Sequence, residues 1–325
     1  MFPQTRLRRL RRTESLRNMT AQPWPGLEKF VWPVFVRAGR GISEPLDNMP
    51  GQSRMSADVL VEKLEPLTAQ GLGGVMLFGV IEAARKDASG SSAFDPRGPV
   101  QQAIAVVKKA FPQLTVFSDV CLCAYTDHGH CGPLDQAGQV DNDAALDLLQ
   151  KVAVSHAQAG ADCVAPSAMM DGQVQVLRAA LDGAGRHDTL LMSYSTKFAS
   201  SMYGPFREAE QSAPSHGDRR GYQADYLDAR TALRESQLDE DEGADILMVK
   251  PALFYLDIIQ RLRRRTDLPL AAYNVSGEYA MLAAAAARGA GDLRAMVRES
   301  ISAIQRAGAD IIISYWAGRY LEIFG

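Results

Sequence analysis

The sequence predicts an α/β protein folded as a (β/α)8 barrel, and three observations lead to this fold. Short apolar runs alternate with stretches of helical periodicity from residue 25 onward. Three junctions of almost the same sequence connect a helical stretch to the next apolar run. Strands that alternate with helices form parallel sheets, and eight such units in just under about 300 residues match a closed barrel better than an open sheet.

The apolar runs are the expected strands and the periodic stretches are the expected helices. The strands are expected at residues 30–36, 74–80, 115–123, 162–166, 189–194, 245–249, 269–275 and 310–316. The clearest helices are expected at 142–158 and 292–307, each with an apolar stripe along one face. Asp141 or Asn142 is the expected cap of the first helix, and Gly160 is its expected end.

The repeated junctions place a glycine where a helix must stop and the chain must turn into a strand. They have the sequences Ala159-Gly160-Ala161-Asp162, Glu242-Gly243-Ala244-Asp245 and Ala307-Gly308-Ala309-Asp310. An open doubly wound sheet is the alternative architecture. No Gly-x-Gly-x-x-Gly follows an expected strand, which weakens the nucleotide-binding form of that alternative.

Composition bounds the partners and the compartment. The 325 residues carry a net charge of −3, which argues against nucleic acid as the main partner. No uncharged apolar run approaches the roughly 20 residues of a membrane span. Four cysteines in this length do not suggest a disulfide framework, so a reducing compartment fits best. The first twenty residues contain six arginines and form a basic tail, which suits a solvated tail, a nucleic-acid arm, a leader or a docking segment.

Residues 119–132 are the most informative run of the chain. Asp119, Cys121 and Cys123 should share one face of a strand, and Cys131 can return to them from a glycine-containing loop. Three thiolates are a ligand set for Zn²⁺. His128 or His130 as fourth ligand would make the zinc structural, whereas an open fourth position would make it catalytic. The remaining cysteine, Cys163, is expected to pack in the core.

Two lysines follow neighbouring strands of the expected barrel. Lys197 comes just after the fifth strand, and Lys250 ends the sixth. Chemistry in such barrels lies at the carboxyl ends of the strands. Two ammonium groups held close together in a partly apolar mouth depress each other's pKa, and a neutral lysine forms Schiff bases with ketones. The long segment between these strands contains Arg207 and Arg219, and it is expected to act as a lid whose arginines hold a carboxylate.

Four motifs together resemble one family. Residues 119–132, 193–201, Met248-Val249-Lys250-Pro251 and 274–279 resemble porphobilinogen synthase, also called δ-aminolevulinic acid dehydratase, and the resemblance extends from about residue 5 to the C-terminus. It implies a barrel domain at 26–325 and an extended basic arm at 1–25 that serves subunit assembly, usually of a homo-octamer. It also implies the condensation of two molecules of 5-aminolevulinate to porphobilinogen in the cytoplasm, without nucleic-acid or membrane partners.

The resemblance also implies residue roles. Lys250 is expected to form the Schiff base with the first substrate, whose carboxylate Ser276 and Tyr315 would hold. Lys197 is expected to bind the second substrate. The carboxylate of this second substrate would be held by Arg207, Arg219 and Gln223. Cys121, Cys123 and Cys131 would hold a catalytic zinc with an open position, and Asp119 could assist proton transfer or orient a lysine.

The chain departs from the family pattern at one position. Some members hold a second zinc with a histidine that corresponds to His130 and a cysteine that corresponds to Gly221. Because the cysteine is absent here, no second zinc of that kind is expected. Many bacterial members hold an allosteric Mg²⁺ on a glutamate that corresponds to Glu235, so Glu235 is a candidate for such a site.

Two other functions compete with this interpretation. A class I aldolase with one Schiff-base lysine and a structural zinc would explain Lys250, but it leaves Lys197 and the anion-binding residues without a purpose. A zinc-stabilised scaffold whose basic arm binds RNA would need a basic face on the folded body, and the net charge does not suggest one.

Overall fold

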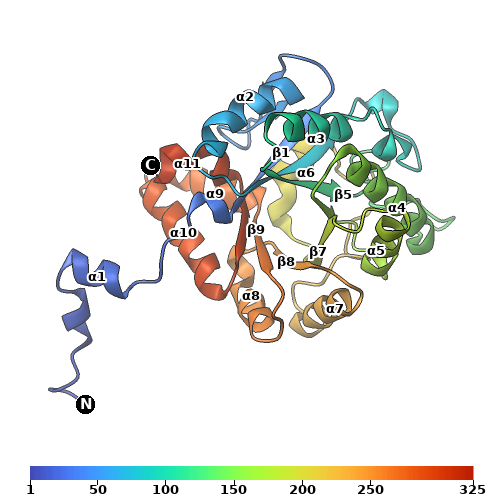
Figure 1. Cartoon of the computed structure of the whole chain (residues 1–325). Helices are drawn as coiled ribbons and strands as arrows, with labels where there is room; N and C mark the ends of the chain where they lie inside the picture. The colour runs from blue at the N-terminus through green and yellow to red at the C-terminus, as the bar shows by residue number, and fades with distance from the viewer. Residues whose placement is uncertain (325) are drawn as a thin grey trace.

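The computed structural model describes residues 1–324, in which eight parallel strands close into a barrel (Figure 1). The barrel order is β1-β4-β5-β6-β7-β8-β9-β10, and β10 pairs with β1 to close it. The ten strands are β1 (Phe30–Arg37), β2 (Ser43–Pro45), β3 (Ser53–Met55), β4 (Gly74–Val80), β5 (Thr115–Val120), β6 (Cys163–Pro166), β7 (Leu190–Lys197), β8 (Ile246–Lys250), β9 (Leu270–Asn274) and β10 (Ile311–Ser314). The predicted (β/α)8 barrel is therefore confirmed.

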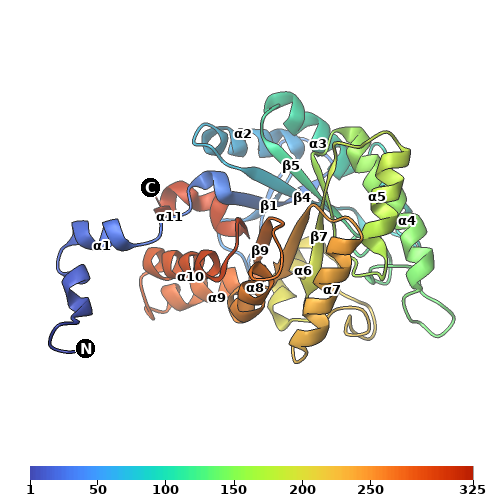
Figure 2. The same cartoon turned by 60° about the horizontal axis from the view of Figure 1, so that its bottom comes forward.

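Helices surround the barrel, as the turned view shows (Figure 2). They are α2 (Ala57–Thr68), α3 (Pro99–Ala110), α4 (Asn142–Ala159), α5 (Gln173–Gly183), α6 (Gly204–Glu210), α7 (Ala229–Asp241), α8 (Leu256–Arg263), α9 (Ser276–Ala287), α10 (Leu293–Ala307) and α11 (Tyr320–Phe324), whereas α1 (Glu14–Thr20) lies on the N-terminal arm. The core fills the barrel and the layer between strands and helices, where most apolar side chains are fully buried. Among residues 1–324, no helix is long and apolar enough to cross a membrane.

The two clearest predicted helices begin at aspartate caps. Asp141 accepts a hydrogen bond from the backbone N–H of Ala144 at the start of α4, so Asp141 is the cap and Asn142 the first helical residue. Asp292 accepts the corresponding bond from Ala295 at the start of α10. A side-chain oxygen in this position pairs one of the N–H groups that a helix leaves free at its start.

In the repeated junctions, the glycine and the aspartate have different structural roles. Gly160, Gly243 and Gly308 have φ values of 104°, 100° and 121°, a conformation that other residues adopt with strain. The aspartate two residues later accepts a hydrogen bond from a backbone N–H near the start of the preceding strand. The pairs are Asp162 with the N–H of Val116 (2.8 Å), Asp245 with Leu191 (2.7 Å) and Asp310 with Leu270 (2.9 Å). The junction therefore ends a helix and anchors two neighbouring strands.

Three predicted strand ends are wrong. The fifth barrel strand was expected to end at residue 194, but β7 continues to Lys197, so this lysine ends the strand instead of following it. The third barrel strand was expected to run to residue 123, but β5 ends at Val120 and the cysteines lie in the turn that follows. The last strand was expected to reach residue 316, but β10 ends at Ser314, where a 3-10 helix begins. Ser314 caps this helix by accepting from the N–H of Trp316, so the polar residue stops the strand.

The basic tail extends away from the barrel (Figures 1 and 2). It contains a short 3-10 helix at Leu7–Arg11 and α1, and neither has a buried residue. Met1, Phe2, Leu7 and Met19 are apolar side chains that are exposed on this arm. Trp24, where the arm meets the barrel, packs against Phe324 with ring centroids 5.1 Å apart.

Candidate active site

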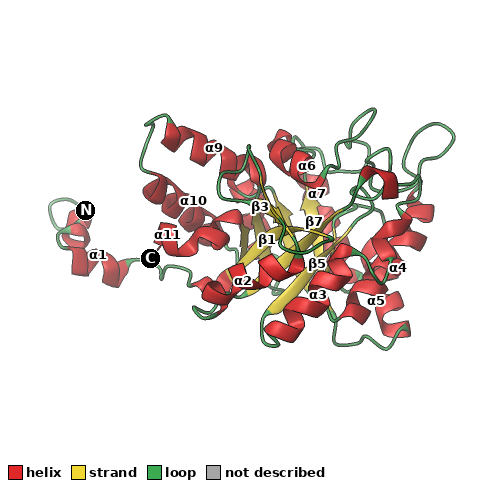
Figure 3. Ribbon diagram, turned by 90° about the horizontal axis from the view of Figure 1, so that it is seen from above, coloured by secondary structure: helices red, strands yellow, loops and turns green. Residues whose placement is uncertain are grey.

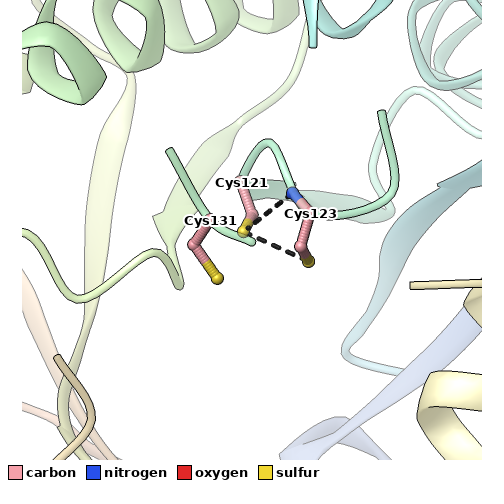
Figure 4. A group of neighbouring side chains, drawn as sticks. All are labelled: Cys121, Cys123 and Cys131. Carbon is pink, nitrogen blue, oxygen red and sulfur yellow. Dashed lines mark hydrogen bonds between the residues drawn. The ribbon is translucent and has the colours of Figure 1, made fainter. Parts of the chain in front are cut away.

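Three cysteines meet in the turn after β5 (Figure 4). The sulfurs of Cys121, Cys123 and Cys131 all lie within 4.8 Å of one another, and that of Cys121 is 3.4 Å from that of Cys123. All three side chains are buried and free of disulfides. Hydrogen bonds from Cys121 and Cys123 hold the pKa of the Cys131 thiol well below its usual value, while the Cys123 bond raises the pKa of Cys121. The low pKa of Cys131 favours its thiolate form, which suits the binding of a cation.

A tight loop returns Cys131 to the other two cysteines. Thr126 donates its hydroxyl to the carbonyl of His130 at 2.8 Å, and His130 donates its N–H to the ring of His128. Both ring nitrogens of His130 have other neighbours: the Tyr222 hydroxyl at 3.2 Å and the carbonyl of His216 at 3.0 Å. The compact ligand group found in residues 1–324 therefore consists of cysteines alone.

The two predicted lysines face each other across neighbouring strands. Lys197 and Lys250 are register partners at the ends of β7 and β8, as expected from the strand order. Their exposed fractions are 5% and 4%. Burial, and next to it the charge of Lys197, lowers the pKa of Lys250 to about 7. Lys197 donates its ammonium to the carbonyl of Ser167.

Aromatic rings surround the Lys250 amine. Its Nζ atom lies 4.1 Å from the ring centroid of Tyr273, 4.9 Å from Phe206, 5.0 Å from Tyr194, 5.5 Å from Tyr203 and 5.9 Å from Phe78. These rings come from β4, β7, β9 and the segment that follows β7. No sequence motif connects them, so sequence analysis missed this group of rings.

Two carboxylates share the site with the lysines. Asp119 lies near the end of β5, and burial raises its pKa to about 6 although Lys197 opposes the shift. Its Oδ1 atom is buried without a hydrogen-bond partner among the described residues. Glu210, at the end of α6, is 2% exposed and accepts from the thiol of Cys123 at 3.6 Å. Sequence analysis missed Glu210, although its spacing of three from Arg207 places both on one face of α6.

The segment between β7 and β8, which was predicted to act as a lid, covers one end of the barrel. In Figure 3, α6 lies over one end of the barrel. Arg54 donates to the carbonyls of Glu208 and Ala209, which attaches the end of α6 to the body. Arg219 donates to the carbonyls of Gly129 and Ser212, so it connects the lid to the loop that carries Cys131.

A small cavity under this segment collects five of the predicted site residues. Lys197, Lys250, Arg207, Arg219 and Cys123 all line it. Its free volume is about 10 Å³, which is room for about one water molecule. In this conformation the cavity has no room for a ligand larger than that.

Three of the five predicted substrate-binding residues do not line this cavity. Gln223 lines a neighbouring groove of about 720 Å³, and its buried amide has no hydrogen-bond partner within residues 1–324. Ser276 accepts from the N–H of Phe206 at 3.0 Å, so in this closed form it holds the lid. The Tyr315 hydroxyl lies 3.3 Å from that of Tyr273, the ring nearest to Lys250.

Glu235 lies on α7 and lines the larger groove together with Asp171 and Asn142. Burial raises its pKa to about 7, and Asp171 and Asp228 contribute. Its Oε2 atom is buried and unpartnered in the part of the chain that the structure describes. Glu235 is well apart from the cysteine cluster in sequence and lines a different cavity.

The fold and the buried reactive groups at its mouth define a barrel enzyme. A sequence model of delta-aminolevulinic acid dehydratase matches residues 4–323. The chain therefore belongs to the delta-aminolevulinic acid dehydratase family, as the sequence motifs predicted. The relative from Escherichia coli (strain K12) is 50% identical over 312 residues, 96% of this chain and 95% of the relative. The relative from Synechococcus elongatus is 50% identical over 320 residues, 98% of each chain. Both are named delta-aminolevulinic acid dehydratase.

A solved structure agrees with the fold. The delta-aminolevulinic acid dehydratase (porphobilinogen synthase) of Toxoplasma gondii ME49 superposes with a TM-score of 0.95 at 39% identity. The match covers 98% of this chain and 91% of that one. That protein was crystallised with its reaction product porphobilinogen.

Proposed function

We propose that this enzyme condenses two molecules of 5-aminolevulinate to porphobilinogen, with loss of two waters, through Schiff bases on Lys250 and Lys197. Family membership supports the reaction, since the relatives bear the name of this dehydratase and the Toxoplasma gondii protein binds porphobilinogen. The pair of buried lysines beside a thiol cluster supports the chemistry.

The observation that carries the proposal is the environment of Lys250. An amine with a pKa of about 7 is about half neutral at pH 7 and mostly neutral by pH 8, so its lone pair can attack a ketone. The adduct loses water to give the Schiff base. Asp119 has a pKa of about 6, which the charges of both lysines affect, so it is suited to take up and return protons there.

The second substrate would be held by the lid. Arg207 and Arg219 both have a buried Nε atom without a hydrogen-bond partner among the described residues, and the amide of Gln223 is unpartnered as well. Buried donors of this kind favour a ligand that is anionic. A carboxylate between the two arginines would satisfy them. Ser276 and Tyr315 would hold the other carboxylate once the lid opens and Ser276 leaves the N–H of Phe206.

The three cysteines fit a zinc ion. Tetrahedral zinc with bonds of about 2.3 Å to sulfur separates its sulfurs by about 3.8 Å, which the 3.4 Å between Cys121 and Cys123 approaches. Zinc here would supply Lewis-acid polarisation of a substrate oxygen. The protein's part is to keep the thiols buried and to deliver them from a loop fixed by Thr126 and Arg219. Glu235 is the proposed ligand of an allosteric Mg²⁺, supported by its unpartnered oxygen in the larger groove.

The arm and the cysteines support an assembly and a compartment. Exposed apolar side chains on an arm that leaves the barrel are suited to contact another subunit, which supports assembly with further copies of the chain; the proposed homo-octamer follows from the family resemblance. All four cysteines are free in the structure, which supports a reducing compartment such as the cytoplasm.

Borohydride trapping tests the proposal. With 5-aminolevulinate, reduction should attach the substrate to Lys250, which peptide mass spectrometry identifies, and porphobilinogen should form without the reductant. Lys109, an exposed lysine on α3, is the internal control and should remain unmodified. A chain that forms no porphobilinogen and traps no substrate at Lys250 would refute the proposal.

A further inference from the structure

Glu278 is a fully buried carboxylate in the first turn of α9, and both of its oxygens accept hydrogen bonds. Oε2 accepts from the N–H of Val275 at 2.8 Å and from the side-chain amide of Asn274 at 2.9 Å. Oε1 accepts from the N–H groups of Ala252 at 3.1 Å and Leu253 at 2.7 Å. All of these partners are donors, so the ionised carboxylate, which only accepts, satisfies the whole set. Burial raises the pKa of Glu278 to about 7, and these hydrogen bonds oppose the shift.

A helix cap accounts for only one of the two oxygens of Glu278. A glutamate at the third position of a helix commonly accepts from the N–H of the residue before the helix, here Val275, and a negative charge is favoured there. The other oxygen serves no cap, because its partners Ala252 and Leu253 belong to the loop that follows Lys250. Glu278 therefore connects the end of β8 to the start of α9.

The connection extends from Glu278 to β10. Asn274, which ends β9, donates to Glu278 and accepts at its Oδ1 atom from the hydroxyl of Ser314 at 3.0 Å. Ser314 ends β10, so one buried chain of hydrogen bonds joins the ends of β8, β9 and β10. The residues proposed to hold the first substrate lie at these three ends, and they are Lys250, Ser276 and Tyr315.

We propose that Glu278 is a positioning residue for the first substrate. It fixes the amine of Lys250 relative to the hydroxyls of Ser276 and Tyr315. The inference deepens the proposed function, because it depends on a first substrate that is bound between these groups. In 5-aminolevulinate, two methylene groups separate the ketone carbon from the carboxyl carbon. A Schiff base at one end and hydrogen bonds at the other therefore need one set separation, and a misplacement of about 1 Å can cost on the order of 100-fold in rate.

Borohydride trapping with two ketones tests the inference. 1-Amino-2-butanone is the same aminoketone as 5-aminolevulinate without the carboxyl group. In Glu278→Gln one oxygen becomes an NH2 group that cannot accept, so either the loop after Lys250 or the start of α9 loses its bonds. At subsaturating ketone, the initial trapping rate at Lys250 should fall about tenfold or more for 5-aminolevulinate and less than about twofold for 1-amino-2-butanone. A general loss of stability or a changed pKa of Lys250 would instead slow both ketones alike.

Two further variants frame this result. Asp245→Asn is the matched control, because Asp245 accepts from the N–H of Leu191 just before β8, at the strand end opposite to Lys250. It should leave the ratio of the two trapping rates unchanged. Asn274→Leu keeps Glu278 but removes its link to Ser314. The ratio should fall about threefold or more there, since one hydrogen bond is typically worth about 1 kcal/mol.

The ratio of the two trapping rates decides the outcome. A Glu278→Gln enzyme with the wild-type ratio would overturn the inference, even if both rates fall together. If this variant does not fold, an unchanged ratio in Asn274→Leu would overturn it. A wild type that traps neither ketone at Lys250 would refute the proposed function instead.

Discussion

Lys250 and Lys197 occupy equivalent places at the ends of paired strands, yet their surroundings differ. Both are nearly fully buried and they are register partners. Lys197 donates to the carbonyl of Ser167, whereas no hydrogen-bond acceptor for the Lys250 amine is found within residues 1–324. The amine of Lys250 instead faces five aromatic rings.

The difference indicates how one barrel mouth can hold two lysines with separate tasks. Aromatic faces attract a cation, but less strongly than water does. Burial therefore prevails at Lys250 and lowers its pKa to about 7. The carbonyl of Ser167 accepts a hydrogen bond from Lys197 and so fixes the position of that amine. We infer that Lys250 is the first nucleophile and that Lys197 acts on the second substrate.

Replacing either lysine with methionine should have the largest effect on turnover, and the two variants should differ in borohydride trapping. Lys250→Met should lose roughly 10³-fold or more in kcat and should lose borohydride trapping, because no amine remains to attack the first ketone. Lys197→Met should lose kcat to a similar degree but should still trap substrate at Lys250. Turnover assays and mass spectrometry of the trapped protein measure both results. A Lys197→Met enzyme with wild-type turnover would favour an aldolase with a single Schiff base.

Replacing a cysteine of the metal cluster should have the next largest effect on kcat. Cys123→Ser should reduce bound zinc from one per chain to near zero and lower kcat by roughly 10²-fold or more, because a serine hydroxyl is a poor zinc ligand at neutral pH. Metal analysis and porphobilinogen assays measure these outcomes. Cys163→Ala is the control, since Cys163 is packed in β6 away from the cluster. If removal of zinc by a chelator melts the barrel in circular dichroism, the metal is structural.

The contrast between the lysines also shows what sequence could predict. Strand periodicity and the repeated glycine junctions predicted the barrel, and the barrel order predicted that Lys197 and Lys250 are neighbours. These inferences succeed because strand alternation and the strand-end rule are local or follow from chain order. The cysteines were predicted to be close, but through a strand that in fact ends at Val120. A turn and a strand both bring residues 121 and 123 together, so the spacing of the cysteines could not distinguish a turn from a strand.

The remaining parts of the site depend on contacts between distant segments. The rings around Lys250 come from several strands and the lid, and their convergence follows from the closed barrel rather than from any motif. Glu210 is near Cys123 only because the lid folds down onto the turn after β5. Ser276 in this closed form bonds to the lid. Lid position is a tertiary property that residue spacing does not encode.

The pH dependence of trapping at Lys250 should show a smaller effect, and it tests how much Lys197 lowers the pKa of Lys250. Because only the neutral amine attacks, a lysine with a pKa of about 7 is roughly one-tenth reactive at pH 6 and nine-tenths at pH 8. The initial trapping rate at Lys250 should therefore rise about tenfold between these pH values and level off above pH 8. Lys197→Met should move the midpoint upward, because the neighbouring positive charge that lowers the pKa is gone. A rate that still climbs above pH 9 would indicate an ordinary, solvated lysine.

Glu235 provides the smallest expected effect, because it lines a groove apart from the lysines. Its pKa of about 7 and its unpartnered Oε2 atom indicate a carboxylate that lacks a cation. If Mg²⁺ binds there, it should raise kcat a few-fold in the wild type and leave Glu235→Gln unstimulated, since an allosteric coupling of about 1 kcal/mol corresponds to about fivefold. Because Mg²⁺ binds the ionised carboxylate, stimulation should fall as the pH drops below about 7. Trapping at Lys250 should be unaffected by the substitution, as expected if the regulatory site is separate from the catalytic amine. A loss of trapping would instead show that Glu235 supports the structure of the barrel mouth.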